Sequence, residues 1–295
     1  MKRISLLAVL ALLFAQQSFA GPWIKSLAQA QKQAKTKNQL IFVDMFADWC
    51  GWCHRMEQEV FPSEAFQKAT DDMVLLRLNT EDGADGTKLA QQYGISTLPT
   101  FVVLTPDMMI AGIIRGYAPS NEFVKILDER RDEYKAFVTR AGDEAKLGDP
   151  AKRLALAKEY RTRYGLTQSE SRLRKLLTEQ KLPNDVRDEA YYELAVSQLL
   201  QKKYADAQKT VLAFSKLQNS GESYERSRLL LGQSYVEQGN YLAAVTEFRN
   251  FKKNFPTSPL LRNVEVILPQ LERQLANPAP AATTTTTTTA PANKQ

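Results

Sequence analysis

Apolar residues follow two different spacings along the chain, and the change between them falls near its middle. In the first half, uninterrupted apolar runs alternate with segments in which apolar residues recur every three or four positions. Uninterrupted runs indicate strands covered on both faces, and the longer spacing indicates helices that bury one face. The expected strands are residues 40–43, 73–78, 100–104 and 110–114, and the expected helices are residues 24–34, 50–61, 84–93 and 120–137. This alternation predicts an α/β domain built on a central sheet.

Beyond residue 150 the apolar positions have helical spacing almost throughout, and they repeat. The clearest unit covers residues 228–256, with the small residues Gly232 and Ala244 and the aromatic ring of Phe248. Apart from Arg228, which stands where the pattern has tryptophan, the unit resembles a tetratricopeptide repeat. In such a repeat the small residues let two antiparallel helices approach closely.

Weaker copies of this unit precede it, in residues 194–207 and 151–180, and a terminal helix follows Pro259. Three helix pairs and a cap meet the roughly three units that a stable array needs. The resemblance therefore implies an all-α, tetratricopeptide-like helical repeat domain. Stacked helix pairs form a concave groove, so we expect a peptide or protein partner there. The alternative is a helical stabiliser docked on the first domain.

The first twenty residues have the order of a secretory signal peptide. Lys2 and Arg3 precede an apolar run over residues 4–14, and the small Ser18 and Ala20 stand where a signal peptidase reads. The run is shorter than the roughly 20 residues of a spanning helix, which disfavours an uncleaved anchor. We expect cleavage after Ala20 and a periplasmic mature chain.

The composition divides the chain further. The expected parts are a signal peptide at 1–20, a first domain at 21–141, a linker at 142–150, helical repeats with a cap helix at 151–276 and a tail at 277–295. The tail consists mainly of Pro, Ala and seven consecutive threonines, a composition that buries no core, so we expect it to be disordered. The formal charge of +6 falls to +4 without the two cations of the signal peptide. No basic strip is present, which argues against a nucleic-acid partner.

The two cysteines and the only histidine lie together in Cys50-Gly51-Trp52-Cys53-His54. A secreted protein stapled by disulfides normally carries several pairs, and a pair this close in sequence closes no useful loop. C-x-x-C after a strand is typical of a redox pair, and C-x-x-C-H is typical of covalent haem attachment. Haem predicts a small helical domain with a second axial ligand. Because a buried-strand pattern leads into Cys50 instead, the redox interpretation is favoured, with no cofactor and no metal.

Residues around this motif resemble the thioredoxin family. Residues 42–53 resemble the family signature, and residues 96–100 resemble its cis-proline loop. Within the family, the chain resembles the periplasmic C-terminal domain of the transmembrane thiol:disulfide interchange reductase. That domain has one acid six residues before the first cysteine and another four after the second, where this chain has Asp44 and Glu57. The resemblance covers residues 22–140 and implies a thioredoxin fold, with both acids in the catalytic site.

Helix geometry assigns different roles to the two cysteines. Cys50 at a helix N-terminus faces unpaired N–H groups and the positive end of the macrodipole, which favours its thiolate. We therefore expect Cys50 to be the exposed, attacking sulfur and Cys53, one turn further, to resolve the mixed disulfide. Asp44 lies in an apolar run, and burial would raise the pKa of its carboxyl toward that of a proton relay. The alternative for Asp44 is a strand-end acid that faces water.

The expected substrate contacts lie on both sides of the cysteines. By resemblance, Leu98 and Pro99 present backbone to a substrate strand, with a cis bond between them. Gly51 and Trp52 form the dipeptide between the sulfurs, and Trp49 precedes them. We expect both tryptophans to shape an apolar contact surface, although core packing is an alternative role for Trp49.

One further loop has residues of a calcium-binding type. Residues 81–86 carry three acids and two glycines but lack the spacing and the final Glu of a calcium loop. We expect a turn that caps the following helix.

The sequence thus predicts an exported thiol:disulfide oxidoreductase of the protein-disulfide reductase kind. Its substrates would be disulfide-bearing exported proteins, and a membrane thiol-reductase would resupply electrons. A disulfide oxidase or isomerase is one alternative, disfavoured because Gly51 and Trp52 stand where the familiar oxidase has a histidine. A non-catalytic periplasmic adaptor built on the repeats is the other.

Overall fold

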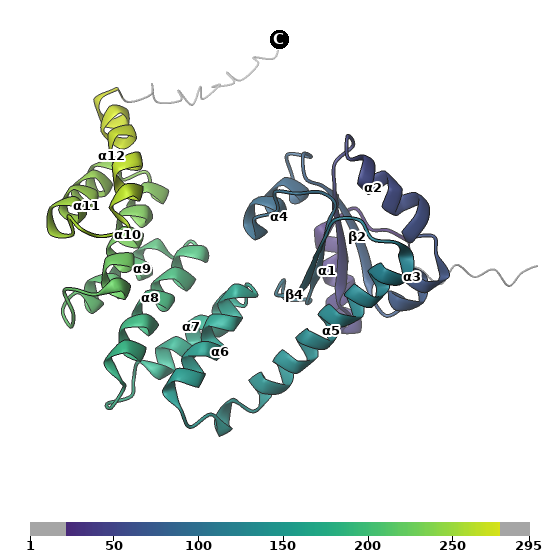
Figure 1. The fold of residues 1–295 in the computed structure, drawn as a ribbon, viewed down its shortest axis with the longest axis horizontal. Coiled ribbons are helices and arrows are strands. Elements are labelled where there is room, and N and C mark those ends of the chain that lie inside the picture. The colour runs from purple at the N-terminus through teal and green to yellow at the C-terminus, as the bar shows by residue number, and fades with distance from the viewer. Residues whose placement is uncertain (1–21, 278–295) are drawn as a thin grey trace, which may run out of the picture. The chain divides into compact units, whose positions relative to one another are not determined.

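The computed structural model describes residues 22–277. The predicted signal peptide and the threonine run lie outside this range. Contacts divide the chain into two compact units, the first ending at Ser169 and the second beginning at Glu170. Each unit is described by itself below (Figure 1).

A four-stranded sheet forms the centre of the first unit. Its strands are β1 (Ile41–Phe46), β2 (Val74–Asn79), β3 (Thr100–Leu104) and β4 (Ile110–Arg115). They lie side by side in the order β2-β1-β3-β4, with β1 parallel to β2 and the other neighbours antiparallel. The interior position of β1 explains its uninterrupted apolar run, because both of its faces are covered.

Helices cover both faces of this sheet, as Figure 1 shows. On one face, α1 (Leu27–Lys37) and α4 (Asp85–Tyr93) pack against alternate residues of β1 such as Val43. On the other face, Phe42 packs among residues of three helical segments. These segments are the π-helix η1 (Met56–Val60), α3 (Glu64–Ala69) and α5 (Ser120–Gly142), and α2 (Gly51–Arg55) directly precedes η1. The predicted elements occur in the predicted order, and α3 is a short additional helix that the hydrophobic pattern does not predict.

The first unit continues beyond the predicted linker. After η2 (Glu144–Lys146), helix α6 (Pro150–Thr162) packs Leu156 and Tyr160 against Phe137 of α5 and Met109 before β4. The contact boundary after Ser169 therefore lies well beyond the linker expected at 142–150. The sequence shows helical spacing in α6 but does not reveal which domain receives its apolar face.

The turn after α6 is bonded to the start of β4. The backbone N–H of Ile110 donates to the carbonyl of Arg163 at 2.7 Å, and the Arg163 guanidinium donates to the carbonyls of Ile110 and Ala111. The same guanidinium lies 4.7 Å from the ring centroid of Phe137. At β2, Ile24 forms a parallel bridge with Leu76.

The second unit is entirely helical in its described residues. Its helices are α8 (Asn184–Leu200), α9 (Tyr204–Phe214), α10 (Glu222–Glu237), α11 (Tyr241–Asn254) and α12 (Leu261–Ala276), while α7 (Leu166–Leu176) begins in the first unit. Neighbouring helices pack as pairs, α8 with α9 and α10 with α11, and α12 covers α11. These two pairs and the terminal helix α12 lie in the second unit, whereas α6 packs in the first.

The clearest repeat shows why its key residues are needed. A Cβ atom at Gly232 would lie 2.4 Å from the ring of Phe248, so only glycine fits where α10 and α11 cross. Arg228, the departure from the repeat pattern, donates to Glu247 of α11 at 2.7 Å. Both side chains are largely buried, so the ion pair joins the two helices at this position.

Candidate active site

The two cysteines form a disulfide at the start of α2, the helix that follows β1 in the chain. Cys50 is the N-cap of α2, and its Sγ accepts a hydrogen bond from the backbone N–H of Cys53 at 3.2 Å. The carbonyl of Cys50 accepts from the N–H of His54. A sulfur that receives an amide hydrogen bond at a helix start is stabilised as a thiolate once the disulfide is reduced.

Neither cysteine is well exposed in this oxidised state. Cys50 has 3% of its surface accessible and Cys53 has 1%. The expectation of an exposed Cys50 is therefore wrong for the disulfide form. Gly51, between them, is exposed. The peptide bond between Leu98 and Pro99 is cis, with Leu98 half-buried and Pro99 buried.

Asp44 lies in the middle of β1 and is 1% exposed. Burial raises the pKa of its carboxyl to about 7, and the nearby Arg77 charge acts in the opposite direction. In the described structure neither carboxyl oxygen accepts a hydrogen bond. The alternative of a water-facing acid at the strand end is thus contradicted, because β1 extends two residues past Asp44 and keeps it inside the sheet.

Arg77 is a residue of the site that sequence reasoning missed. It is the register partner of Asp44 on β2, and its Nε lies 3.1 Å from Asp44 Oδ2. Its Nη2 pairs with Oε1 of Glu57, whose side chain is 32% exposed. The signal in the sequence was a single arginine in the otherwise apolar strand at 73–78, but only the strand register brings it to Asp44.

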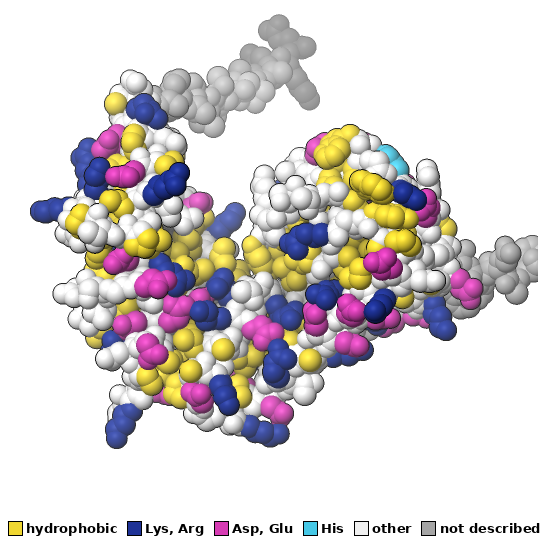
Figure 2. Space-filling model, viewed as in Figure 1, with side chains coloured by type: hydrophobic (Ala, Val, Ile, Leu, Met, Phe, Trp, Pro, Cys, Tyr) yellow, Lys and Arg dark blue, Asp and Glu magenta, His cyan; other side chains and the backbone are white. Residues whose placement is uncertain are grey.

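The two tryptophans beside the cysteines face solvent. Trp49 is 70% exposed and Trp52 is 55% exposed, so the core-packing alternative for Trp49 is contradicted. The indole Nε1 of Trp49 donates to Glu81 at 2.8 Å. Figure 2 shows hydrophobic side chains gathered on the surface over α2.

Trp52 belongs to a surface network that the sequence did not suggest. Its ring centroid lies 5.3 Å from that of Tyr117, and the guanidinium of Arg55 lies over both rings. Glu59 accepts hydrogen bonds from Arg55 and from the hydroxyl of Tyr117. Arg55 and Glu59 have the spacing of one helix turn, but nothing in the sequence predicts that Tyr117, which follows β4, joins them.

His54 lies on the surface beside the disulfide. Its Nε2 is 2.9 Å from the carbonyl of Asp48, and its Nδ1 is 3.8 Å from Glu57 Oε1. In the loop at 81–86, the Asp82 carboxylate accepts hydrogen bonds from the backbone N–H groups of Ala84, Gly86 and Thr87. This is the helix-capping turn that the sequence predicts.

The described part of the chain shows neither a membrane-spanning helix nor a cluster of metal-ligating side chains. Among residues 22–277, no helix combines the length and the apolar character that crossing a bilayer requires. Within the same residues, no three His, Cys, Asp or Glu side chains are grouped as metal ligands.

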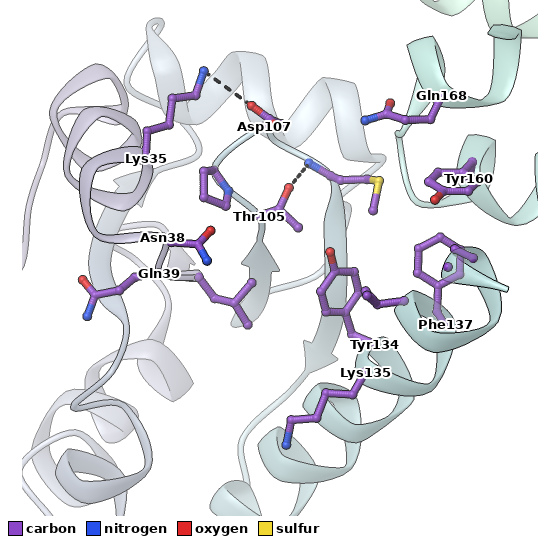
Figure 3. A pocket seen from close by; sticks show the side chains of 16 residues that line it. Lys35, Asn38, Gln39, Thr105, Asp107, Tyr134, Lys135, Phe137, Tyr160 and Gln168 are labelled. Atoms are coloured by element: carbon purple, nitrogen blue, oxygen red, sulfur yellow. Dashed lines mark hydrogen bonds and ion pairs between the residues drawn. The ribbon is translucent and has the colours of Figure 1, made fainter.

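A cavity of about 860 Å³ lies at the other end of the sheet, near Leu40, which precedes β1. In Figure 3, the ion pair of Lys35 and Asp107 lies on one side, and Tyr134 and Phe137 lie on the other. No predicted site residue lines this cavity.

Comparisons with known proteins bear on both units. Residues 27–131 match the family of thioredoxin-like domains, and residues 226–258 match the tetratricopeptide repeat. The predicted fold class is thereby confirmed: a thioredoxin-like α/β domain is followed by an all-helical region that contains a tetratricopeptide repeat.

The similar curated proteins include several thiol:disulfide interchange proteins. The chain is 36% identical over 88 residues to DsbD of Pseudomonas fluorescens, covering 28% of this chain and 15% of that protein. It is 32% identical over 112 residues to DsbD of Pasteurella multocida, covering 37% and 19%. The chain thus matches less than a fifth of the length of these relatives. The oxidised C-terminal domain of DsbD from Neisseria meningitidis aligns at 17% identity and a TM-score of 0.33, covering 37% of this chain and all of that one.

Proposed function

We propose that this chain is an exported thiol:disulfide oxidoreductase that reduces protein disulfides through Cys50 and Cys53. The observation that carries the proposal is the Cys50–Cys53 disulfide at the start of α2, together with the buried carboxyl of Asp44 on β1, the strand that precedes it in the chain. The likeness of the first unit to the interchange proteins supports the same chemistry.

In the proposed reaction, the reduced chain transfers two electrons to its substrate. The Cys50 thiolate attacks one sulfur of a substrate disulfide, forms a mixed disulfide and releases the first substrate thiolate. The Cys53 thiol then gives its proton to the Asp44 carboxylate and attacks the Cys50 sulfur. The bond between Cys50 and the substrate breaks, the second substrate thiolate leaves, and the Cys50–Cys53 disulfide is formed.

The other predicted residues are assigned supporting roles. Trp49 and Trp52 offer apolar surface beside the disulfide, and both are exposed. The Leu98–Pro99 segment and Gly51 would contact the substrate chain. We assign Glu57 to the proton-handling group, since it pairs with the same arginine as Asp44.

The cellular context belongs to the same proposal. The signal-like first twenty residues support a periplasmic location, and a membrane thiol-reductase would return electrons to the disulfide. The helical repeats would hold a peptide or protein partner, because stacked helix pairs create an extended groove.

Reduction of insulin disulfides by the dithiothreitol-reduced chain tests the chemistry. Wild type should precipitate insulin, whereas Cys50→Ser should not, since it lacks the attacking sulfur. Equilibration with glutathione buffers then decides the direction. A potential near −230 mV or below supports a reductase, and one near −120 mV identifies an oxidant instead. If Cys50→Ser retains the full function of the wild-type chain in cells, the repeats act as a non-catalytic adaptor.

A further inference from the structure

One guanidinium in the first unit is shared by two carboxyl groups. Arg77 Nε lies 3.1 Å from Asp44 Oδ2, and Arg77 Nη2 pairs with Glu57 Oε1. Its guanidinium also lies 4.0 Å from the ring centroid of Phe46. The arginine on β2 therefore joins a buried acid on β1 to a partly exposed acid on η1.

The contacts differ in a way that bears on ionisation. Asp44 is buried and accepts no hydrogen bond in the described structure, so its charged form depends on the nearby cation. Glu57 keeps about a third of its side chain exposed, although its Oε1, which faces Arg77, is buried. Since one cation faces two acids, the charge that favours ionised Asp44 is reduced whenever Glu57 is also ionised.

Other charged groups around the cluster lie at its border. His54 of α2 is 3.8 Å from Glu57 through its Nδ1. A crevice of about 230 Å³ beside Arg77 is lined by Lys25 and Asp82 among other residues. Arg77 lines this crevice, whereas Asp44 does not.

We propose that Arg77 is a positioning residue of the disulfide-exchange site, which couples the ionisation of buried Asp44 to that of Glu57. This inference rests on the proposed function for its role in the reaction. When Glu57 is neutral, Arg77 acts on Asp44 alone and the buried acid ionises more readily. When Arg77 is removed, burial acts on Asp44 unopposed and the acid holds its proton to higher pH.

Two substitutions should therefore move the titration of Asp44 in opposite directions. Arg77→Met should raise its midpoint by about one pH unit or more, because an opposite charge at this distance has that effect. Glu57→Gln should lower the midpoint by a smaller amount, because it removes a negative charge and frees the cation. A purely structural role for Arg77 predicts no such pair of opposed changes.

The midpoint can be read without any assay of activity. The free energy of unfolding of the oxidised chain is measured between pH 4 and pH 9 through tryptophan fluorescence. This free energy should fall as the pH rises and then level off, and the pH at which it levels off gives the titration midpoint of Asp44 in the folded chain. Arg131→Met is the matched control, since Arg131 on α5 is similarly buried and pairs with Asp72 away from the site. Its midpoint should equal that of wild type. Arg77→Lys, which keeps a cation, covers the case in which Arg77→Met does not fold, and its midpoint should lie above that of wild type.

The pH profile of insulin reduction is the second measurement, and it should move with the midpoint in each variant. Unchanged midpoints in the Arg77 and Glu57 variants, or changes in the same direction, overturn the inference. If wild type reduces no disulfide at any pH, the proposed function fails instead, and the unfolding measurements still decide whether Arg77 couples the two acids.

Discussion

Replacing Asp44 by Asn should change how the stability of the first unit depends on pH. The carboxyl of Asp44 has an ordinary pKa of 3.8 in the unfolded chain, and burial raises that pKa to about 7 in the folded chain. Between these pH values the folded state holds a proton that the unfolded state has lost. The resulting contribution to stability is complete below about pH 4 and is lost as the pH rises to about 7.

The magnitude follows from the gap between the two values. At about 1.4 kcal/mol per pH unit, the free energy of unfolding should fall by about 4 kcal/mol through this group between pH 4 and pH 8. Asn is nearly isosteric and does not titrate, so the variant lacks this loss. The difference in unfolding free energy, variant minus wild type, should therefore grow by about 4 kcal/mol over the same range.

Urea unfolding of the oxidised chain, followed by tryptophan fluorescence, measures this difference. All three tryptophans, Trp23, Trp49 and Trp52, lie in the first unit, so the signal reports that unit alone. Asp71→Asn is the control, since Asp71 is exposed and its replacement should cost less than about 0.5 kcal/mol at every pH. Parallel pH dependence in Asp44→Asn and wild type would refute the buried-acid assignment.

Three other substitutions test the remaining assignments. Cys53→Ser should accumulate a covalent complex between Cys50 and the substrate, visible by mass spectrometry without reductant; its absence would contradict the assignment of Cys53 as the resolving thiol. Gly232→Ala should destabilise the second unit by about 1–3 kcal/mol, because its Cβ would lie 2.4 Å from the ring of Phe248. Circular dichroism follows the unfolding of the helices, and an unfolding midpoint equal to that of wild type would contradict the close crossing of α10 and α11. Arg228→Met should cost about 3–5 kcal/mol by leaving Glu247 buried without its cation, and adding Glu247→Met should recover most of that loss if the ion pair is the cause.

The hydrophobic pattern was enough to predict the strands of the first unit and the main helices that cover them, because strand burial and helix spacing are local properties. The apolar run around Val43 marks an interior strand, and Cys50 at the end of that run marks a helix start. The burial of Asp44 also followed from its place in the run. Each of these features could be predicted because it depends on a few residues that are adjacent in sequence.

The features that the sequence did not reveal depend on pairing between distant segments. Arg77 meets Asp44 through strand register, and Tyr117 reaches Trp52 from the far end of β4. The attachment of α6 to the first unit depends on the packing of Tyr160 against Phe137. Helical spacing shows that α6 has an apolar face but does not show which domain that face packs against. The low exposure of Cys50 is a property of the closed disulfide, which spacing does not describe.

The hydrogen bonds of Arg163 at β4 have a consequence for how the first unit behaves on its own. β2 and β4 are the outer strands of the sheet, and outer strands with free N–H and C=O groups recruit strands from other molecules. Ile24 pairs with part of the outer edge of β2. At β4, the carbonyl of Arg163 accepts from the N–H of Ile110, and its guanidinium donates to the carbonyl of Ile110. A chain cut at residue 141 keeps the disulfide and Asp44 but loses this cover on β4. We therefore expect such a fragment to self-associate through β4, and the segment up to Ser169 to limit aggregation of the first unit.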